Sequence, residues 1–391
     1  MSKLDTDSLS PYFRAHVRGD WRNGSAWLSY TGKLILSFLS GVIKAKVVGS
    51  IYKAFVPTSS GFRKSIPALL EPSEVEKLSM WTARHAGHSG QFCPGHAQDS
   101  LESIIQAAIS KKMQMLALTE HMPRHEIDRY PEELSAGTTL EAMTENERAY
   151  VSEATLLRDK YRGQIELAVG FESDWIRPES VQLIDQSIST HAYDLFVGSV
   201  HHVHTIPIDY DRAMYEDARQ QAGGTDEKLF ESYFDAQLDM LQATKPPVVG
   251  HFDLIRLKSD CPNPSFPQFP GVWQRIARNL DFIASYGGIL ELNFAAVRKG
   301  LLEPYPVSDI CQAASKRNLR FCLSDDSHGI DHLAHSYDHV LPFLRKNSIR
   351  SLMVLGSNAD GGNYGDRRFP TLEAREVDVD ILEKHPFFQH A

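Results

Sequence analysis

Histidine and carboxylate side chains directly follow several short apolar runs in this 391-residue chain. The polar residues that end these runs are Glu120 and His121, Glu172, His201 and His202, His251 with Asp253, and Asp325, Asp326 and His328. Imidazole and carboxylate groups are the ligands that divalent zinc, manganese and iron favour in proteins. Packing alone would favour apolar side chains at such positions, so the repeated pattern predicts a metal site.

No single position decides this prediction, because a lone histidine at a strand end is more often a hydrogen-bonded structural residue than a ligand. Asp326 and His328 are more informative, since residues two apart point to the same side of an extended chain. That spacing suits two ligands of one ion. The recurrence at five separate strand ends supports the metal site more strongly than any one of them.

The apolar runs alternate with amphipathic helical stretches from about residue 100 onward, which is typical of βα units around a parallel sheet. Strands are predicted at 113–119, 165–171, 194–200, 247–250, 288–293, 320–324 and 351–355, and helices at 101–112, 144–161, 227–244 and 273–286. The carboxyl ends of barrel strands meet at one mouth, where catalytic groups collect. We therefore expect the polar strand ends to converge there.

Composition limits the classes of function. The chain is 42% hydrophobic with a net charge of −9. Lys and Arg outnumber Asp and Glu before residue 85, whereas Asp and Glu outnumber Lys and Arg in the remainder, which is therefore acidic. An acidic body argues against a nucleic-acid groove, which needs clustered Lys and Arg. Four cysteines without paired spacing predict neither a zinc ribbon nor disulfides, and a reducing, cytoplasmic compartment fits them.

The N-terminal part differs from the rest of the chain. Its apolar stretch at 34–43 is too short to span a membrane. A buried or poorly ordered helix is the first interpretation, and a membrane-surface or import segment is the alternative. Proline, glycine and a change in charge balance mark a boundary within 57–84. We predict an N-terminal extension at 1–84 and one catalytic barrel at 85–391.

Seven motifs, in order and sensibly spaced, resemble those of the polymerase and histidinol phosphatase (PHP) superfamily, in its fungal monofunctional histidinol-phosphate phosphatase branch. They are HSGQFCPGHA (88–97), LTEHMPR (118–124), GFES (170–173), GSVHH with PID (198–209), GHFD (250–253), ELNFAAVRKGLLEPYP (291–306) and LSDDSHG (323–329). The resemblance covers about residues 86–345. It implies a distorted seven-stranded βα barrel that hydrolyses L-histidinol phosphate, a small-molecule phosphomonoester, in histidine biosynthesis.

The resemblance also implies a centre of three divalent ions, with zinc, manganese or iron as candidates. The metal ligands that carry over are His88, His96, His121, Glu172, His201, His251, Asp326 and His328. Glu172, Asp326 and His328 are the candidate catalytic residues, with Glu172 as a bridging carboxylate. A metal-bridged hydroxide would attack phosphorus while the ions spread the developing charge.

Four further residues are candidates for holding the substrate. Arg298 and Arg124 could take two phosphate oxygens each, because a guanidinium is planar and forked; a surface salt bridge is the alternative for both. Asp209 and Glu120 could orient metal ligands or bind the substrate ammonium.

The first motif departs from the family pattern. An H-x-H pair is expected, yet Ala86 stands two residues before His88, and His85 lies one residue too early, facing away unless a bulge realigns it. One hypothesis is that residues 1 to about 85 are foreign to the ancestral enzyme. The other is a genuine extension in which His85, as a ninth candidate ligand, still reaches the metal.

Two other functions stay open on these grounds. The first is another phosphoesterase of the superfamily, such as a nuclease or nucleotide phosphatase, although the acidic body and the LTEHMPR and RKGLLEPYP segments count against it. The second is a weakly active or inactive relative, which the substitution at Ala86 suggests.

Changing Ala86 to His tests the damaged motif. If the motif has lost a ligand, Ala86→His should bind more metal per chain than the parent and hydrolyse phosphomonoesters faster, as measured by elemental analysis and phosphate release. Equal metal content and equal rates in the two proteins would refute the hypothesis.

Overall fold

The computed structural model describes residues 87–389. His85, Ala86, the apolar stretch at 34–43 and the predicted boundary at 57–84 lie outside the described residues. Within them, no helix is both long and apolar enough to cross a membrane. All four cysteines are described, and none forms a disulfide, as their irregular spacing predicts.

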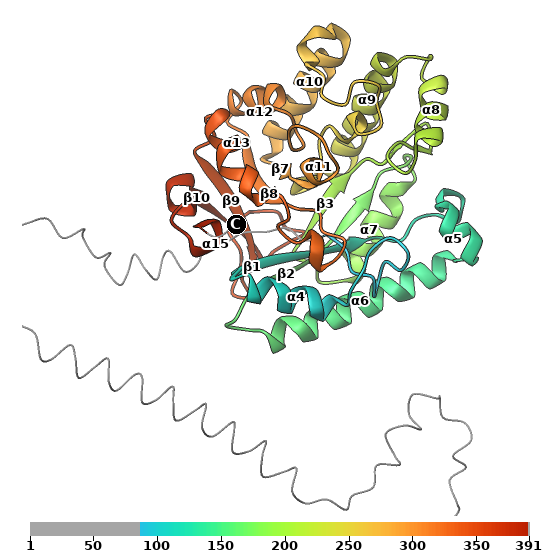
Figure 1. The fold of residues 1–391 in the computed structure, drawn as a ribbon. Helices are drawn as coiled ribbons and strands as arrows, with labels where there is room; N and C mark the ends of the chain where they lie inside the picture. The colour runs from blue at the N-terminus through green and yellow to red at the C-terminus, as the bar shows by residue number, and fades with distance from the viewer. Residues whose placement is uncertain (1–86, 390–391) are drawn as a thin grey trace, which may run out of the picture. The chain divides into compact units, whose positions relative to one another are not determined.

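A six-stranded parallel sheet forms the centre of the fold (Figure 1). Its strands pair in chain order: β1 (Met115–His121), β2 (Glu166–Asp174), β3 (Leu195–Ser199), β6 (Val248–Val249), β7 (Ile289–Asn293) and β8 (Arg320–Ser324). They coincide with six of the seven predicted strands, to within a few residues. Because all six run in one direction, their carboxyl ends lie at one end of the sheet.

Helices between the strands cover the outside of the sheet (Figure 1). The longer ones are α4 (Leu101–Ser110), α6 (Leu140–Lys160), α7 (Ser180–Thr190), α8 (Arg212–Gln221), α9 (Asp226–Thr244), α10 (Pro270–Tyr286), α12 (Ser308–Ser315) and α13 (Val340–Lys346). Short elements lie in the connections: α5 (Pro131–Ala136), β4 (His202–Val203), β5 (Ile206–Pro207) and α11 (Ala295–Arg298). Two more, α14 (Val379–Leu382) and α15 (Pro386–Gln389), follow the last strand.

Local sequence explains where the long helices begin and which face they bury. Thr139 caps α6 by accepting a hydrogen bond from the Ala142 amide, and Thr225 caps α9 in the same way. Tyr150, Ala154 and Leu157 of α6 are buried at a spacing that places them on one face. This face packs onto the sheet, whose strands are almost wholly buried, as expected where helices cover a parallel sheet.

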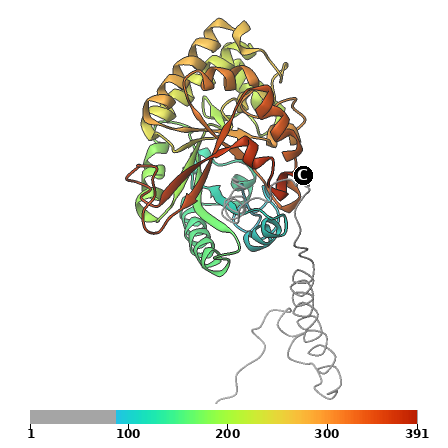
Figure 2. The same ribbon diagram turned by 90° about the vertical axis from the view of Figure 1, so that its left-hand side faces the viewer.

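The seventh predicted strand forms, but it does not join the parallel ladder. β9 (Ser351–Ser357) pairs antiparallel with β10 (Leu372–Asp378). Charged and apolar residues mix in β10, which is half exposed, so no apolar run marked it in the sequence. The β9–β10 hairpin lies across the amino end of the sheet, in contact with β8 and β2 (Figure 2).

Asp194 fastens the hairpin to the sheet. Its carboxylate, just before β3, accepts hydrogen bonds from the hydroxyls of Ser357 at 2.6 Å and Thr371 at 2.7 Å. The same carboxylate accepts from the Val169 amide at 2.8 Å and the Arg158 guanidinium at 2.9 Å. One buried charge therefore joins β2, β3, α6 and the hairpin.

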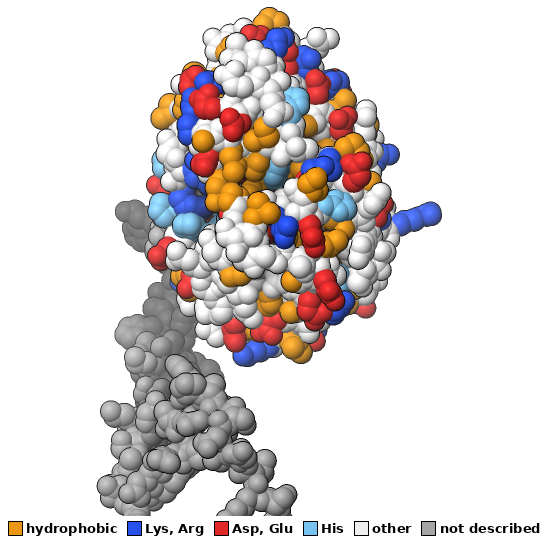
Figure 3. Space-filling view, turned by 90° about the vertical axis from the view of Figure 1, so that its right-hand side faces the viewer, with side chains coloured by type: hydrophobic (Ala, Val, Ile, Leu, Met, Phe, Trp, Pro, Cys, Tyr) orange, Lys and Arg blue, Asp and Glu red, His pale blue; other side chains and the backbone are white. Residues whose placement is uncertain are grey.

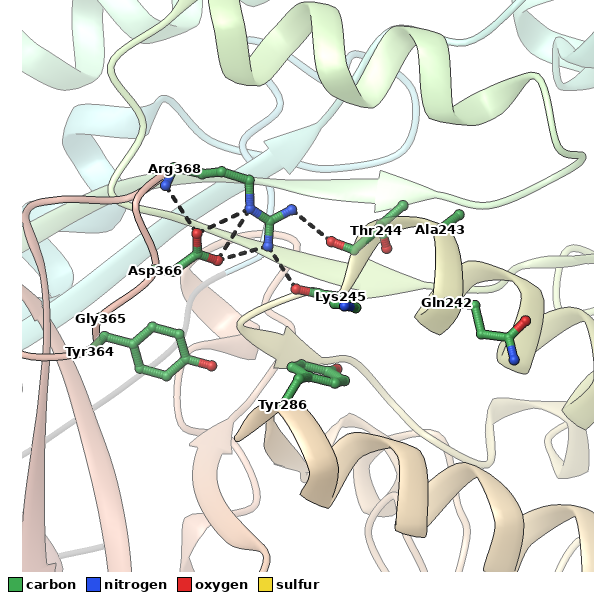
Figure 4. A pocket seen from close by; sticks show the side chains of 9 residues that line it. All are labelled: Gln242, Ala243, Thr244, Lys245, Tyr286, Tyr364, Gly365, Asp366 and Arg368. Carbon is green, nitrogen blue, oxygen red and sulfur yellow. Dashed lines mark hydrogen bonds and ion pairs between the residues drawn. The ribbon is translucent and has the colours of Figure 1, made fainter.

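A hollow at this amino end lies between the last residues of α9 and α10 and the loop at 364–368 (Figure 4). Arg368 lines this hollow. Its guanidinium donates hydrogen bonds to the carbonyls of Thr244 and Lys245 and forms an ion pair with Asp366. These contacts satisfy carbonyls at the end of α9 and hold the loop in place. The hollow is thus at the opposite end of the strands from their polar carboxyl ends.

Removing the Asp194 carboxylate should destabilise the fold without altering the chemistry. Asp194→Ala leaves Arg158 and three other donors without their partner, so the free energy of unfolding should fall by about 3 kcal/mol. Urea denaturation followed by circular dichroism measures the change. Asp185→Ala, on the exposed face of α7, is the control and should change stability by less than about 0.5 kcal/mol. An equal effect of the two substitutions would contradict this role for Asp194.

Candidate metal centre

The polar strand ends converge at the carboxyl end of the sheet, as the sequence predicts. Histidine side chains reach the surface near the middle of this face, among hydrophobic and charged side chains (Figure 3). The eight predicted ligands lie together, linked by short distances between nitrogen and oxygen atoms: His88, His96, His121, Glu172, His201, His251, Asp326 and His328. Their arrangement is that of one continuous cluster.

Three overlapping triads make up most of the cluster. They are His88–His121–Glu172, His88–Asp326–His328 and Glu172–His201–His251, and within each the ligand atoms lie within 4.8 Å of one another. His88 and Glu172 each belong to two triads. A residue shared by two triads could bind two neighbouring ions. A carboxylate suits this role because each of its two oxygens can bind one ion.

Glu172, at the end of β2, is the most connected of these residues. One carboxylate oxygen, Oε2, lies 3.1 Å from His88 Nε2, and the other, Oε1, lies 3.0 Å from His251 Nε2 and 3.5 Å from His201 Nε2. Burial opposes ionisation, but hydrogen bonds from His251 and His88 and the charge of His201 hold the pKa of Glu172 well below its usual range. The side chain is therefore a buried carboxylate.

Two pairs of imidazole nitrogens face each other at hydrogen-bond distance. His201 Nε2 lies 3.1 Å from His251 Nε2, and His96 Nε2 lies 2.8 Å from His328 Nε2. In two of these rings the other nitrogen has a hydrogen-bond acceptor: Asp174 Oδ1 lies 3.3 Å from His201 Nδ1, and the Asp326 carbonyl lies 2.9 Å from His328 Nδ1. A proton on Nδ1 leaves the Nε2 lone pair directed into the cluster.

This donor set fits divalent cations. Imidazole nitrogens and carboxylate oxygens converge here, and the buried Nδ1 atom of His121 has no hydrogen-bond partner within residues 87–389. A nitrogen left in this way in a buried site loses the hydrogen bond that water would give it. Cations bound within the three triads would satisfy His121 and the two facing pairs.

The segment at 87–98 closes the cluster between β8 and β1. The His88 amide donates to the Ser327 carbonyl at 2.7 Å, and the Gln98 amide donates to the His328 carbonyl at 2.9 Å. Gly87 is needed for this approach, since a Cβ there would lie 2.3 Å from the Ser327 carbonyl oxygen. The His88 ring consequently stacks on that of His121, with centroids 3.9 Å apart.

Glu120, at the end of β1, faces inward to His88. It accepts a hydrogen bond from the Ser89 amide at 2.7 Å, and its Oε1 lies 3.6 Å from His88 Nδ1. Burial works against protonation of His88, but Glu120 and Glu172 together raise its pKa to about 10. Of the two predicted alternatives for Glu120, this geometry favours orienting a metal ligand.

The two arginines proposed for phosphate binding both have partners within the protein. Arg298 donates to the carbonyls of Asp325 and Asp326, at 2.8 and 3.0 Å. Arg124 is buried, pairs with Glu133 and lies over the ring of Tyr130, 4.7 Å from its centroid. Arg298 makes no ion pair with a residue in the described part of the chain, whereas Arg124 makes a salt bridge to the partly exposed Glu133, although Arg124 itself is buried.

Asp209 makes no hydrogen bond or ion pair with any residue in the described part of the chain, yet it lies close enough to act on the cluster. Burial tends to lower the pKa of His201, but Asp174, Asp209 and Glu172 raise it to about 9. An unpaired carboxylate beside the cluster remains available to a cationic group.

Sequence reasoning missed two residues of the site. Asp174 stands two residues after Glu172 on β2, so strand alternation places both on one side, and it lies 3.3 Å from both His201 Nδ1 and His202 Nδ1. Lys299 is exposed and its charge acts on Asp326 and His328. The alternation could have identified Asp174; adjacency to Arg298 is the only signal for Lys299.

Comparison with known proteins agrees with the family resemblance of the motifs. The PHP domain model matches residues 85–295. A protein of Schizosaccharomyces pombe described as a probable histidinol-phosphatase is 41% identical over 276 residues, covering 70% of this chain and 89% of the relative. The histidinol-phosphatase of Saccharomyces cerevisiae is 32% identical over 292 residues, covering 66% and 87%.

The fold also resembles a solved structure. Histidinol phosphate phosphatase from Lactococcus lactis, complexed with zinc, L-histidinol and phosphate, aligns with a TM-score of 0.53 at 18% identity, covering 70% of this chain and 97% of that one. At this identity the likeness concerns the fold. Taken with the identity to the two yeast proteins, the motifs and the converging ligands place this chain in the PHP family, among its fungal-type histidinol-phosphatases.

Proposed function

We propose that the chain is a metal-dependent phosphomonoesterase that hydrolyses L-histidinol phosphate to L-histidinol and phosphate in histidine biosynthesis. The observation that carries the proposal is Glu172, a buried ionised carboxylate whose two oxygens face imidazoles from different segments of the chain. The surrounding histidines compensate this buried charge, and divalent cations bound by the same histidines would compensate it in their place. The identity to the fungal enzymes supports the substrate.

Three divalent ions fit the three overlapping triads, and zinc is supported by the zinc-bound Lactococcus enzyme; manganese and iron remain candidates because they accept the same ligands. When bound, these ions supply an activated water and positive charge next to the phosphoryl oxygens. Glu172 and Asp326 hold negative charge at the centre, and His328 directs Nε2 into it. We assign the catalytic role to these three residues.

The substrate carries an ammonium group at the end away from its phosphate. We assign Asp209 to that ammonium, because its carboxylate is unpaired within residues 87–389 and acts on the cluster. Arg124, which pairs with Glu133 and lies over the Tyr130 ring, can offer its remaining N–H donors to the phosphate. The cytoplasm suits this reaction, since all four cysteines are free.

A weakly active relative is the second candidate, and the substitution at Ala86 is the observation that favours it. One set of assays distinguishes the histidinol-phosphate phosphatase, the weakly active relative and a nuclease. Metal-loaded protein is assayed against L-histidinol phosphate, nucleotides and single-stranded DNA, together with rescue of a histidine auxotroph lacking this phosphatase. Preferential hydrolysis of histidinol phosphate and rescue support the proposal. Absence of turnover on every substrate supports the weak relative, and preference for DNA supports the nuclease.

The role of Asp209 predicts a change in specificity. Asp209→Asn removes the charge that faces the ammonium, a loss on the order of 1.5 kcal/mol that should raise the KM for histidinol phosphate about tenfold. The KM for 4-nitrophenyl phosphate, which has no ammonium, should stay the same. Steady-state kinetics on both substrates makes the comparison.

Asp217→Asn is the matched control, because Asp217 is an exposed carboxylate on α8. It should leave both KM values unchanged. An equal increase in KM for the two substrates in Asp209→Asn would remove Asp209 from ammonium binding.

A further inference from the structure

Arg298 is the last residue of α11, the single helical turn that follows β7. From there its guanidinium spans the gap to the loop after β8. Nη1 donates to the Asp325 carbonyl at 2.8 Å, and Nη2 donates to the Asp326 carbonyl at 3.0 Å. Two consecutive carbonyls are thus held by the two arms of one planar, forked group.

The loop that Arg298 holds has an uncommon backbone conformation. Asp326 has a φ of 45°, in the left-handed region that residues with a Cβ seldom adopt. Such a conformation persists only where surrounding contacts impose it. Besides Arg298, the Ser324 hydroxyl contributes by accepting from the Asp326 amide at 3.2 Å. These contacts set the direction in which the Asp326 carboxylate leaves the backbone.

The Asp326 carbonyl has a second partner, which links Arg298 to another predicted ligand. His328 Nδ1 donates to this carbonyl at 2.9 Å, so Nε2 of His328 carries the lone pair and lies 2.8 Å from His96 Nε2. A shift of the carbonyl would move both the carboxylate of Asp326 and the ring of His328. One arginine therefore acts on two residues of the same triad.

We propose that Arg298 is a positioning residue, which holds the loop at 325–328 so that Asp326 and His328 are preorganised to bind one metal ion. This role replaces the phosphate contact predicted for Arg298 from the sequence. Lys299, the next residue, is exposed and forms no ion pair within the described residues, so its ammonium can approach a substrate anion. The inference rests on the metal centre proposed above.

Arg298→Lys tests the proposal, because lysine keeps the charge but cannot hold two carbonyls with a rigid fork. In a titration of the metal-free protein with Co²⁺, followed by visible absorption, the weakest-bound ion should bind only at about 10- to 100-fold higher Co²⁺ concentration than in the parent. At saturating metal, the inhibition constant of inorganic phosphate should stay within about twofold of the parent value. Arg298→Gln should weaken Co²⁺ binding at least as much.

Lys299→Gln is the matched control, since it removes a positive charge from the same turn without touching the loop carbonyls. It should bind Co²⁺ no more weakly than the parent and should weaken phosphate inhibition. Thermal unfolding without metal checks that all three variants fold. Parent-like Co²⁺ binding by both Arg298 variants, with weaker phosphate inhibition, would overturn the positioning role. Failure of the parent itself to bind Co²⁺ would instead overturn the metal centre.

Discussion

The carboxylate of Glu172 is buried among imidazole rings, and much of the rest of the structure serves to keep it there. Its oxygens approach His88 and His251 at 3.1 and 3.0 Å, although these rings come from segments far apart in the chain. Taking a carboxylate out of water is expensive unless charge or hydrogen bonds compensate it. The site must therefore be assembled accurately, and its assembly depends on where the strands end.

The parallel sheet provides that accuracy. Strands that run in one direction deliver their last residues to one end, where β1, β2 and β8 place His121, Glu172 and Asp326 side by side. The opposite end is closed by the β9–β10 hairpin through Asp194, away from the chemistry. Hydrogen bonds around the ligands complete the arrangement: Asp174 orients His201, and the Asp326 carbonyl orients His328.

Much of this could be predicted from the sequence. Apolar runs located the six sheet strands, and the polar residues that follow five of these runs supplied most of the candidate ligands. His88 and His96 came from the motif resemblance. The partner of the seventh strand could not be found, because β10 alternates charged and apolar residues at a half-exposed edge. Likewise, a sequence shows that Arg298 is near the site but not which atoms it meets. Its partners are backbone carbonyls. Every residue has a backbone carbonyl, so residue types alone could not identify these two as partners.

The central claim is that Glu172 bridges metal ions within a single cluster of histidines and carboxylates. Anomalous X-ray scattering at the zinc edge, from crystals of zinc-loaded protein, tests it most directly. The account predicts peaks within about 2.2 Å of both carboxylate oxygens of Glu172, with His88 and His251 among the other ligands. A Glu172 carboxylate that still accepts its hydrogen bonds from these rings, with zinc bound elsewhere or not at all, would contradict it.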